Sequence, residues 1–384
     1  MIDNNLKYIK NKNKKKYKES QKDFFRKEKL TIKEVSKGII LPAYRNEQTD
    51  RFWSVGGVLD KDKHFVEESA TSYFFGGNYE IYNENIKYID EEVIFFGPFI
   101  EHWGHFICDQ ISRLWYILEN PNKYKIAYCG WDFGNKRKET IRSNYLELLE
   151  LIGIKKEQLI EVQRPLQFKK IIIPEFSFKP GFYYTNEYCN LIKKIVDEAL
   201  KKDISVEEKI YFTRQNFKFA DKESGEKDLV EIFIENGFVV KSPENLSLIE
   251  QINILNKAKT VAAITGSITH NYMFCMNKET NLILLNKFGR INRYQSIIDN
   301  ISLGNITYID SYKSFFTVLF GMGPFILNNN NSFKKFCLDN NYKYRKPNFD
   351  LNKYKWYFKE YFKTYSSKEN KELLNSQKST SKFY

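Results

Sequence analysis

Two histidines and one aspartate share a face of a predicted helix near position 105. His102, His105 and Asp109 follow one another at steps of three and four residues, in a region (residues 103–119) whose apolar side chains recur with helical spacing. Three nitrogen and oxygen ligands with one open position are typical of a hydrolytic zinc site. A carboxylate or an imidazole can instead act as a general base on a hydroxyl group. A purely structural interpretation, in which the backbone and Arg113 satisfy these side chains, stays open beside the other two.

A cationic residue follows a strand in the second half of the chain. Residues Lys209 to Phe212 are predicted to form a strand, and Arg214 comes shortly after it. A guanidinium group where a strand meets a ligand cleft can hold a diphosphate through two parallel hydrogen bonds. The position of Arg214 therefore indicates a phosphate-binding role.

A glycine–serine pair stands at the end of another predicted strand. Gly266 and Ser267 follow the apolar strand Thr260–Ile264 and open a helix, so their backbone N–H groups can face an anion. His270 and Asn271 lie in the first turn of that helix, on the way to the same place. An ordinary turn and helix cap explains the pair as well, and the Gly-Lys-Ser/Thr ending of a Walker loop is absent.

The elements that must position these residues alternate along the chain. Residues 39–100 contain short alternating runs with Gly-Gly turns, which predict a few antiparallel strands. From residue 93 on, apolar runs alternate with helical periodicity, which predicts parallel sheets. The expected strands cover 93–96, 125–128, 158–162, 171–174, 209–212, 238–240, 260–264 and 281–285. The expected helices cover 103–119, 139–151, 186–201, 228–236, 247–257 and 267–275. Two parallel-sheet domains of this kind are expected to leave a ligand cleft beyond the carboxyl ends of their strands.

The positive charge of the chain is concentrated at its ends. Of the net charge of +13, residues 1–38 carry +8 and residues 350–384 carry +4. A near-neutral body argues against a basic groove for nucleic acid and favours solvated tails, or tails that touch an anionic membrane. The general abundance of Lys, Asn, Ile and Tyr in this chain is the simpler explanation and stays open.

The sequence also bears on the compartment. No apolar run approaches the roughly 20 residues of a membrane-spanning helix. The charged N-terminus lacks the apolar core of a secretory signal, so a cytoplasmic location is expected. The five cysteines are scattered without a CxxC pair, which fits a reducing compartment.

The C-terminal region predicts an amphipathic helix over residues 352–365. Lysines largely surround its aromatic face, which consists of Tyr354, Tyr357, Phe358, Tyr361, Phe362 and Tyr365. This face either packs onto the protein or docks at the inner leaflet of a membrane, where a lipid-linked acceptor would be found.

Several short motifs occur in a fixed order between about residues 90 and 285. They are Gly104-His105-Phe106, Asp109, Arg113-Leu114-Trp115, Ile173-Pro174, Ile210-Tyr211-Phe212-Thr213-Arg214, Gly225-Glu226, Gly237-Phe238, Pro243-Glu244, Leu246-Ser247-Leu248, Glu250-Gln251-Ile252, Ala258, Gly266-Ser267, His270-Asn271 and Phe274. In this order they resemble the bacterial branch of glycosyltransferase family 61, which serves capsule and lipopolysaccharide biosynthesis.

The resemblance implies a fold, a reaction and a set of site residues. The fold would be α/β and GT-B-like, with two Rossmann-like domains facing across a cleft. The reaction would be an inverting, metal-independent transfer from a nucleotide sugar to a surface-polysaccharide acceptor. Asp109 takes the acidic position of the Gly-His-Phe helix, and Asp109 or His105 would be the catalytic base. The donor side would consist of Arg214, Glu226, Glu250, Gly266, Ser267, His270 and Asn271.

The same resemblance sets the expected partners and domains. The co-substrate would be a nucleotide sugar, UDP-linked, with no further cofactor, and the acceptor a glycan or a lipid-linked glycan. The expected domains are a basic, mobile or loosely helical lead-in (1–38), an acceptor-side Rossmann-like domain (39–185), a nucleotide-sugar-binding Rossmann-like domain (186–330) and a basic-aromatic helical tail (331–384). The peripheral location expected with membrane docking is the inner face of the membrane.

Two other functions are consistent with parts of the sequence. A metal-dependent hydrolase would use His102, His105 and Asp109 as metal ligands. An RNA-binding protein would use the Lys-rich tails and exposed aromatic residues, although the near-neutral body and the lack of an RNP-type strand motif count against it.

Overall fold

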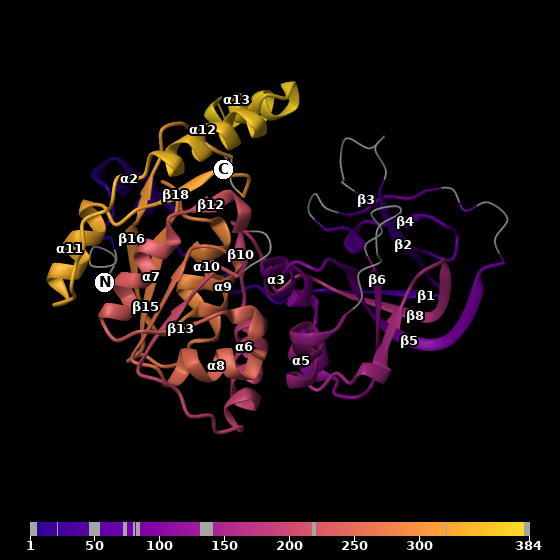
Figure 1. The fold of residues 1–384 in the computed structure, drawn as a ribbon. Coiled ribbons are helices and arrows are strands. Elements are labelled where there is room, and N and C mark those ends of the chain that lie inside the picture. The colour runs from indigo at the N-terminus through magenta and orange to yellow at the C-terminus, as the bar shows by residue number, and fades with distance from the viewer. Residues whose placement is uncertain are drawn as a thin grey trace. The chain divides into compact units, whose positions relative to one another are not determined.

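The computed structural model divides the chain into two compact units (Figure 1). It describes residues 6–20, 22–45, 54–71, 75–79, 81, 85–130, 141–216, 220–319 and 321–379. Unit 1 comprises Met1–Lys22 and Asp203–Tyr384, and unit 2 comprises Asp23–Lys202. The chain therefore begins in unit 1, passes through unit 2 and returns. The mixed α/β class expected from the sequence is confirmed.

Unit 2 is built on a mixed sheet with the strand order β4-β3-β2-β8-β5-β6-β7, in which β1 also pairs with β8. The strands are β1 (Ile32–Ser36), β2 (Ile39–Arg45), β3 (Ser54–Leu59), β4 (Phe65–Val66), β5 (Lys87–Phe99), β6 (Lys125–Gly130), β7 (Leu159–Glu161) and β8 (Leu166–Pro174). The antiparallel strands expected within residues 39–100 are β2, β3 and β4. The pairs β8–β5, β5–β6 and β6–β7 are parallel. A small hairpin of β9 (Phe178–Lys179) and β10 (Tyr183–Tyr184) follows β8.

The helix predicted over residues 103–119 is broken into short turns of different pitch. It consists of α3 (Trp103–His105), a π-helical turn (Phe106–Gln110), a 3-10 turn (Ile111–Arg113) and α4 (Trp115–Glu119). Side chains take carbonyl groups that a regular helix would use: the hydroxyl of Tyr188 donates to the carbonyl of Ile107, that of Ser112 to Asp109, and that of Ser177 to Ser112. This competition explains the irregular pitch.

Two further helices of unit 2 agree with the sequence prediction in type and position. They are α5 (Ser143–Leu151) and α6 (Asn186–Leu200). Residues 139 and 140, with which the prediction of the first helix began, lie outside the described residues. Six side chains of α6 at helical spacing are buried, as an amphipathic helix requires.

Unit 1 is built on a parallel sheet with the order β13-β11-β14-β15-β16. Its strands are β11 (Lys209–Phe212), β13 (Val239–Lys241), β14 (Thr260–Ile264), β15 (Asn281–Asn286) and β16 (Asn305–Asp310). The connecting helices are α7 (Glu226–Glu235), α8 (Leu248–Lys257), α9 (Ser267–His270), continued by a 3-10 turn (Asn271–Phe274), and α10 (Arg293–Ile301). If these five strands are numbered as they follow one another in the chain, their order across the sheet is 2-1-3-4-5. This is a doubly wound order, and its switch point lies between β11 and β14.

Unit 1 also contains a small second sheet and three C-terminal helices. A small sheet has the order β12 (Glu223–Ser224), β18 (Phe325–Leu327) and β17 (Tyr312–Lys313). The C-terminal helices are α11 (Asn331–Asp339), α12 (Leu351–Tyr365) and α13 (Lys368–Ser379), and α12 confirms the helix predicted for residues 352–365. Helices α7 and α11 contribute to one core cluster with the parallel strands. None of the helices in the described part of the chain is long and apolar enough to cross a membrane.

The segment predicted to be a mobile or loosely helical lead-in contains a helix and a strand in its described residues. Helix α2 (Asn11–Ser20) belongs to unit 1, and the side chain of Tyr17 is fully buried there. Asn13 and Tyr17 both donate hydrogen bonds to the carboxylate of Asp310 at the end of β16. Strand β1 belongs to unit 2 and pairs with β8. The first 38 residues therefore contribute to both units.

Candidate active site

A pocket of about 480 Å³ lies in unit 2, beside the π-helical turn. His105 and Asp109 are in its wall, and the Nδ1 atom of His105 lies 2.7 Å from the Oδ2 atom of Asp109. The remaining lining combines rings and apolar side chains with ionisable ones: Thr31, Ile32, Lys33, Glu67, Glu68, Ala70, Thr71, Phe96, Pro98, Ile100, Gln110, Ile173, Glu175, Phe176, Phe178, Lys179, Pro180 and Tyr183. Aromatic faces with nearby polar groups suit a ligand that has both apolar faces and hydroxyl groups.

The His105–Asp109 pair has the geometry of a base and its partner. The two side chains are 25% and 20% exposed, so both are partly shielded from water and still accessible. When Nδ1 of His105 carries the proton and donates it to Asp109, Nε2 is the proton acceptor, and the carboxylate stabilises the imidazolium that forms. Either member of the pair could therefore accept a proton from a hydroxyl group in the pocket.

The third member of the predicted metal set has another role. Nδ1 of His102 accepts a hydrogen bond from the backbone N–H of His105 at 3.4 Å, which caps the first helical turn. Within the residues that the structure describes, no group of three or more His, Cys, Asp or Glu side chains is arranged to hold a metal ion. The metal-dependent hydrolase therefore lacks a described ligand cluster that would support it.

Arg113 stabilises the pocket wall. Its guanidinium group donates to the carbonyl oxygens of Glu68, Ala70 and Pro174, and lies 4.0 Å from the centre of the Phe176 ring. Burial lowers the pKa of Arg113 to about 9. The structural interpretation had Arg113 satisfy the His and Asp side chains of the helix, but its hydrogen bonds go to carbonyl oxygens of two segments that line the pocket.

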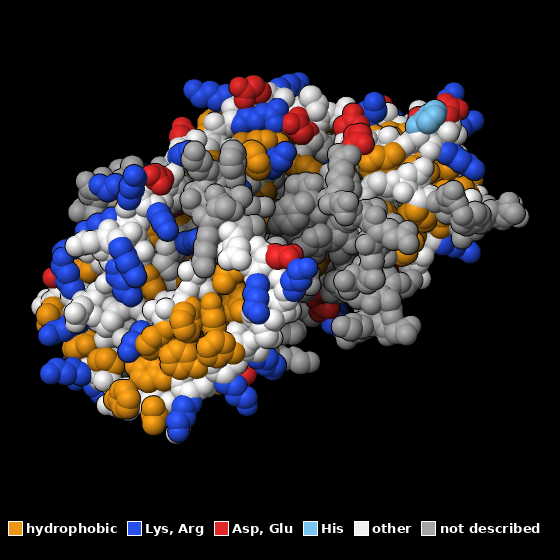
Figure 2. Space-filling view, turned by 90° about the horizontal axis from the view of Figure 1, so that it is seen from above, with side chains coloured by type: hydrophobic (Ala, Val, Ile, Leu, Met, Phe, Trp, Pro, Cys, Tyr) orange, Lys and Arg blue, Asp and Glu red, His pale blue; other side chains and the backbone are white. Residues whose placement is uncertain are grey.

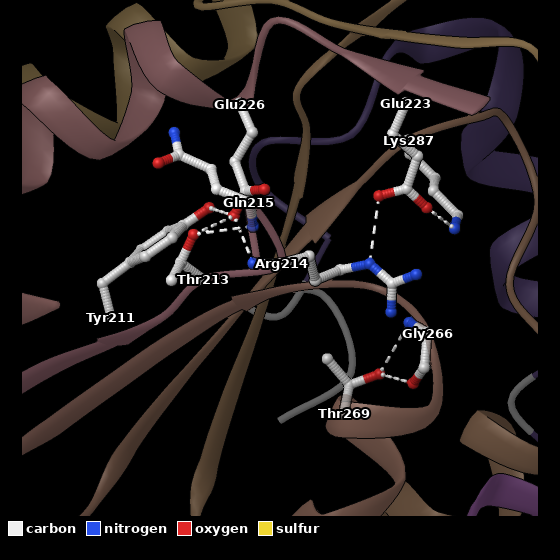
Figure 3. Close-up of polar contacts among 9 residues, drawn as sticks. All are labelled: Tyr211, Thr213, Arg214, Gln215, Glu223, Glu226, Gly266, Thr269 and Lys287. Atoms are coloured by element: carbon white, nitrogen blue, oxygen red, sulfur yellow. Dashed lines mark hydrogen bonds and ion pairs between the residues drawn. The ribbon is translucent and has the colours of Figure 1, made fainter. Parts of the chain in front are cut away.

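In unit 1, Arg214 and Gly266 lie together at the switch point of the parallel sheet (Figure 3). Arg214 follows β11 and Gly266 follows β14, and these strands are neighbours. A Cβ atom on Gly266 would lie 3.0 Å from Nη1 of Arg214, so a side chain there would displace the guanidinium. The carboxyl edge of a doubly wound sheet is where such folds bind ligands.

A buried ion-pair network extends this edge with two residues that the sequence analysis did not single out. Nε of Arg214 lies 3.0 Å from one carboxylate oxygen of Glu223, and Nζ of Lys287 lies 2.5 Å from the other (Figure 3). Burial lowers the pKa of Lys287, although Glu223 opposes this shift. Burial raises the pKa of Glu223, but Lys287 and Arg214 together bring it below its ordinary value. Two cations against one carboxylate leave this cluster with one net positive charge.

Lys287 could have been found from its sequence position. It follows the predicted strand 281–285 as Arg214 follows β11, so the same argument about strand ends applies to both. Nothing in the sequence marks Glu223 in this way, because it does not follow a predicted strand. Its position depends on the short strand β12, which pairs with β18.

Glu226 holds the turn that carries Arg214. Its Oε1 atom accepts hydrogen bonds from the Tyr211 hydroxyl (3.2 Å), the Thr213 hydroxyl (3.0 Å) and the Arg214 backbone N–H (2.9 Å), as Figure 3 shows. Burial raises the pKa of Glu226, and these hydrogen bonds oppose the shift. The structure thus places Glu226 behind Arg214. A donor contact of Glu226 stays a prediction.

Glu250 caps helix α8. Its carboxylate accepts hydrogen bonds from the backbone N–H and the hydroxyl of Ser247, both at 2.8 Å, while the Ser247 hydroxyl accepts from the backbone N–H of Glu250. This reciprocal arrangement is a capping box. These capping contacts are structural, and the predicted donor contact of Glu250 stays a prediction.

The other predicted donor residues surround the start of α9. Ser267 is its first residue and is partly buried. The ring of His270 stacks on Tyr294 with centroids 5.5 Å apart, and the amide of Asn271 donates to Gln251 at 2.8 Å. The backbone N–H of Gly266 donates to the hydroxyl of Thr269, which closes the turn on itself. The structure brings Gly266 and Arg214 together, whereas His270 and Asn271 bond to neighbouring helices.

A family model agrees with the resemblance found in the motifs. No match is found among curated proteins. The family described as Glycosyltransferase 61 has a model that matches residues 103–283. This stretch begins at the turn that carries His105 and Asp109, and it includes β11, β14 and the Arg214–Gly266 pair. The match supports a relationship to glycosyltransferase family 61 and, with it, a glycosyltransferase activity.

Proposed function

We propose that the protein is an inverting glycosyltransferase that moves a sugar from a nucleotide-sugar donor, UDP-linked, to a glycan acceptor of a bacterial surface polysaccharide. The activity itself is supported by the family match. The observation that carries the donor assignment is the guanidinium of Arg214 above Gly266 at the switch point of a parallel sheet, with Lys287 beside it.

The donor side follows from the charge and position of this cluster. A nucleotide sugar presents a diphosphate, and guanidinium and ammonium groups are its usual protein partners. Glu223 holds both cations in place before the donor binds, and the diphosphate would share Arg214 and Lys287 with it. Negative charge develops on the diphosphate as the sugar leaves, so the same cations would stabilise the transition state without a metal.

The acceptor side follows from the pocket in unit 2. Its aromatic rings can stack on sugar faces and its carboxylates and lysines can bind hydroxyl groups. Asp109, or His105 with Asp109 as its partner, would take the proton of one acceptor hydroxyl. The deprotonated oxygen would form the new glycosidic bond as the bond to the diphosphate breaks, from the opposite face, which inverts the anomeric centre.

Calorimetric titration with UDP-, GDP- and CMP-sugars tests the donor assignment. We expect one nucleotide class to bind, Arg214→Ala to weaken its binding by about 1.5 to 3 kcal/mol, and Lys287→Ala to weaken it similarly, since each removes a hydrogen bond to a charged group. Arg345→Ala is the matched control, because Arg345 of unit 1 pairs with exposed Glu235. Unchanged affinity in Arg214→Ala would remove this cluster from the donor site.

A transfer assay with and without a chelator tests the metal-free mechanism. We expect full activity after exhaustive treatment with EDTA, because Arg214 and Lys287 supply the positive charge. Loss of activity that manganese or magnesium restores would contradict this part of the proposal.

A further inference from the structure

Helix α12 carries two aromatic stripes that face different surroundings. The inner stripe consists of Tyr354, Tyr357, Tyr361 and Tyr365, and it packs on residues 313–319 and 322–323 of the same unit. Each tyrosine hydroxyl has a partner in that segment. Tyr365, for example, accepts from the backbone N–H of Leu319 at 2.8 Å and donates to the carbonyl of Gly323 at 2.9 Å. The other three hydroxyls bond to Lys313, Phe316 and Thr317.

The second stripe faces outward and has no polar tips on its rings. It consists of Leu351, Lys355, Phe358 and Phe362, which are spaced at i, i+4, i+7 and i+11. Leu351 is 53% exposed and Phe362 is 62% exposed. The sequence pattern predicts a single face for six of the aromatic side chains of this helix, all but Trp356. In the structure Tyr357 and Tyr365 are buried and Phe362 is exposed, whereas Tyr354, Phe358 and Tyr361 are partly exposed.

Neighbouring rings make this outer stripe into a continuous surface. Phe315 (41% exposed) and Phe316 (40%) both contact Phe358, and Phe316 also contacts Phe362. Phe349, at 79% exposure, lies against Tyr354 at the other end. We call the set Phe315, Phe316, Phe349, Leu351, Phe358 and Phe362 the outer aromatic surface.

This distribution is the reverse of what solvation alone favours. A tyrosine keeps its hydroxyl in water at low cost, whereas an exposed phenylalanine gains nothing from water. Single exposed apolar side chains are common, but contiguous exposed patches mark interaction sites. Five exposed or partly exposed phenylalanines in mutual or bridged contact therefore indicate that something covers them.

Lysines accompany the outer aromatic surface. Residues 346–365 contain five lysines and two acidic residues, which gives a net charge of +3. Lys355 and Lys359 are exposed on the same half of α12 as Phe362, and among the described residues neither is in an ion pair. Lys353 is instead paired with Asp228 at 2.9 Å and points toward α7. Figure 2 views the molecule from the side on which α12 and α13 lie in Figure 1, and hydrophobic side chains gather there among Lys and Arg side chains.

We propose that the outer aromatic surface docks on an anionic lipid bilayer. Aromatic rings favour the boundary between headgroups and acyl chains, and lysines beside them bind anionic headgroups. A second copy of the chain is a poorer occupant, since a symmetric contact would bring two patches of charge +3 together. The proposal does not depend on sugar transfer, but it would hold the enzyme at a surface where lipid-linked acceptors reside.

Co-sedimentation of the full chain with vesicles tests the proposal. We expect binding to phosphatidylcholine vesicles that contain phosphatidylglycerol at low salt, little binding to pure phosphatidylcholine, and weaker binding as salt is added. The double variant Phe349→Gln with Phe362→Gln and the double variant Lys355→Glu with Lys359→Glu should each weaken binding by at least about tenfold. All four side chains are exposed, so these variants are expected to fold.

Matched controls change the same chemistry elsewhere on unit 1. Ile234→Gln with Leu338→Gln removes two other exposed apolar side chains, and Lys278→Glu with Lys335→Glu makes the same change in net charge. Both controls should bind like the unchanged protein. The proposal is overturned if the unchanged protein ignores anionic vesicles at low salt, if the controls lose binding as the patch variants do, or if the patch variants abolish self-association and leave vesicle binding intact.

Discussion

Asp109 and His105 form the pair on which the proposed chemistry depends. Asp109→Asn keeps the size of the side chain and a hydrogen bond to His105 but removes the charge. We expect kcat to fall by roughly 100-fold or more, with the donor dissociation constant nearly unchanged, because a base acts on the acceptor. Steady-state kinetics and calorimetry on one preparation give both quantities.

The control for this variant is a similar pair outside the pocket. Asp60 lies 3.5 Å from His64 at the same spacing of four residues, on the surface of unit 2. Asp60→Asn should leave kcat unchanged. Loss of donor affinity in Asp109→Asn, rather than loss of kcat, would move Asp109 to the donor site.

Asp299 gives a pH-dependent stability with a defined sign. Burial raises the pKa of Asp299 to about 7 from an ordinary value of 3.8, and hydrogen bonds from Tyr308 and Gln295 only partly oppose this shift. Between these two pKa values the folded state binds more protons than the unfolded state, so this carboxyl group lowers the free energy of unfolding as pH rises from about 4 to about 7.

The substitution Asp299→Asn removes this dependence. Urea unfolding gives the free energy of unfolding of both proteins at pH 5 and at pH 8. Relative to the unchanged protein, we expect the free energy of unfolding of the variant to be higher at pH 8 than at pH 5 by roughly 1 to 3 kcal/mol. Asp203 provides the opposite case, since its hydrogen bond and ion pair with Lys257 lower its pKa. A gain that is equal at both pH values would show that Asp299 is ionised in the folded protein.

Sequence reasoning at the residue scale succeeds where spacing alone brings groups together. The contact of His105 with Asp109 follows from their i, i+4 spacing, and the positions of Arg214 and Gly266 follow from the ends of predicted strands. It does not distinguish a carboxylate that faces a ligand from one that holds a turn. Glu226 accepts hydrogen bonds from Tyr211 on strand β11 and from Thr213 directly after it, and such partners are known only once the fold is known.

At the scale of elements, apolar runs predicted β11, β13, β14 and β15 of unit 1 to within about one residue, but they did not predict the fifth strand of that sheet, β16. The run Thr260–Ile264 is fully buried on both faces, which is why it is apolar without alternation. The region from Trp103 to Glu119 shows the limit of periodicity. Its apolar spacing is helical, but Ser177 and Tyr188, both far away in the sequence, take carbonyl groups and change its pitch.

The donor side depends on the residues directly after β11, Thr213 and Arg214, which Glu226 holds in place. Glu226→Ala would leave the buried hydroxyls of Tyr211 and Thr213 and the backbone N–H of Arg214 without their acceptor. We expect a loss of about 2 to 3 kcal/mol in the free energy of unfolding, together with weaker donor binding, because Arg214 loses its support.

Two variants of neighbouring carboxylates separate this effect from a general loss of charge. Glu226→Gln retains an acceptor oxygen and should recover most of the stability. Glu231→Ala, on the same helix, removes a carboxylate that is 40% exposed and pairs with Arg345, so it should cost less than about 0.5 kcal/mol. If Glu226→Gln behaves like Glu226→Ala in urea unfolding, the charge of Glu226 rather than its acceptor geometry stabilises the turn.

At the scale of the whole molecule, the least predictable feature was that the N-terminal segment packs in unit 1 with the second half of the chain. Residues 1–38 are rich in Lys and Asn, and such composition predicts little buried surface. The buried side chains are few and separated, with Leu6, Tyr8, Ile9 and Tyr17 entering the core of unit 1 between exposed lysines. Their partners lie about 300 positions further along, on β16 and α11, and local periodicity carries no information about contacts at that separation.

Tyr17 tests whether this N-terminal segment is an integral part of unit 1. Its side chain is fully buried, its ring lies edge-on to Tyr308 at 5.9 Å, and its hydroxyl donates to Asp310 at 3.3 Å. Asn13 and the backbone N–H of Lys10 donate to the other oxygen of the same carboxylate, both at 2.8 Å. Removing the ring would open a cavity beside the end of β16 and take one donor from a buried carboxylate.

We therefore expect Tyr17→Ala to destabilise unit 1 by roughly 3 kcal/mol, the usual scale for removing a buried aromatic side chain. Hydrogen exchange should show the loss in peptides that cover β15 and β16, while peptides from β5 and β8 keep their protection, because those strands belong to the other compact unit. Lys15→Ala changes the same helix at a side chain that is 88% exposed and should alter neither set. Equal loss of protection in both sets would mean that the two units unfold together, and unchanged protection of β16 would mean that the N-terminal segment only rests on a sheet that is stable without it.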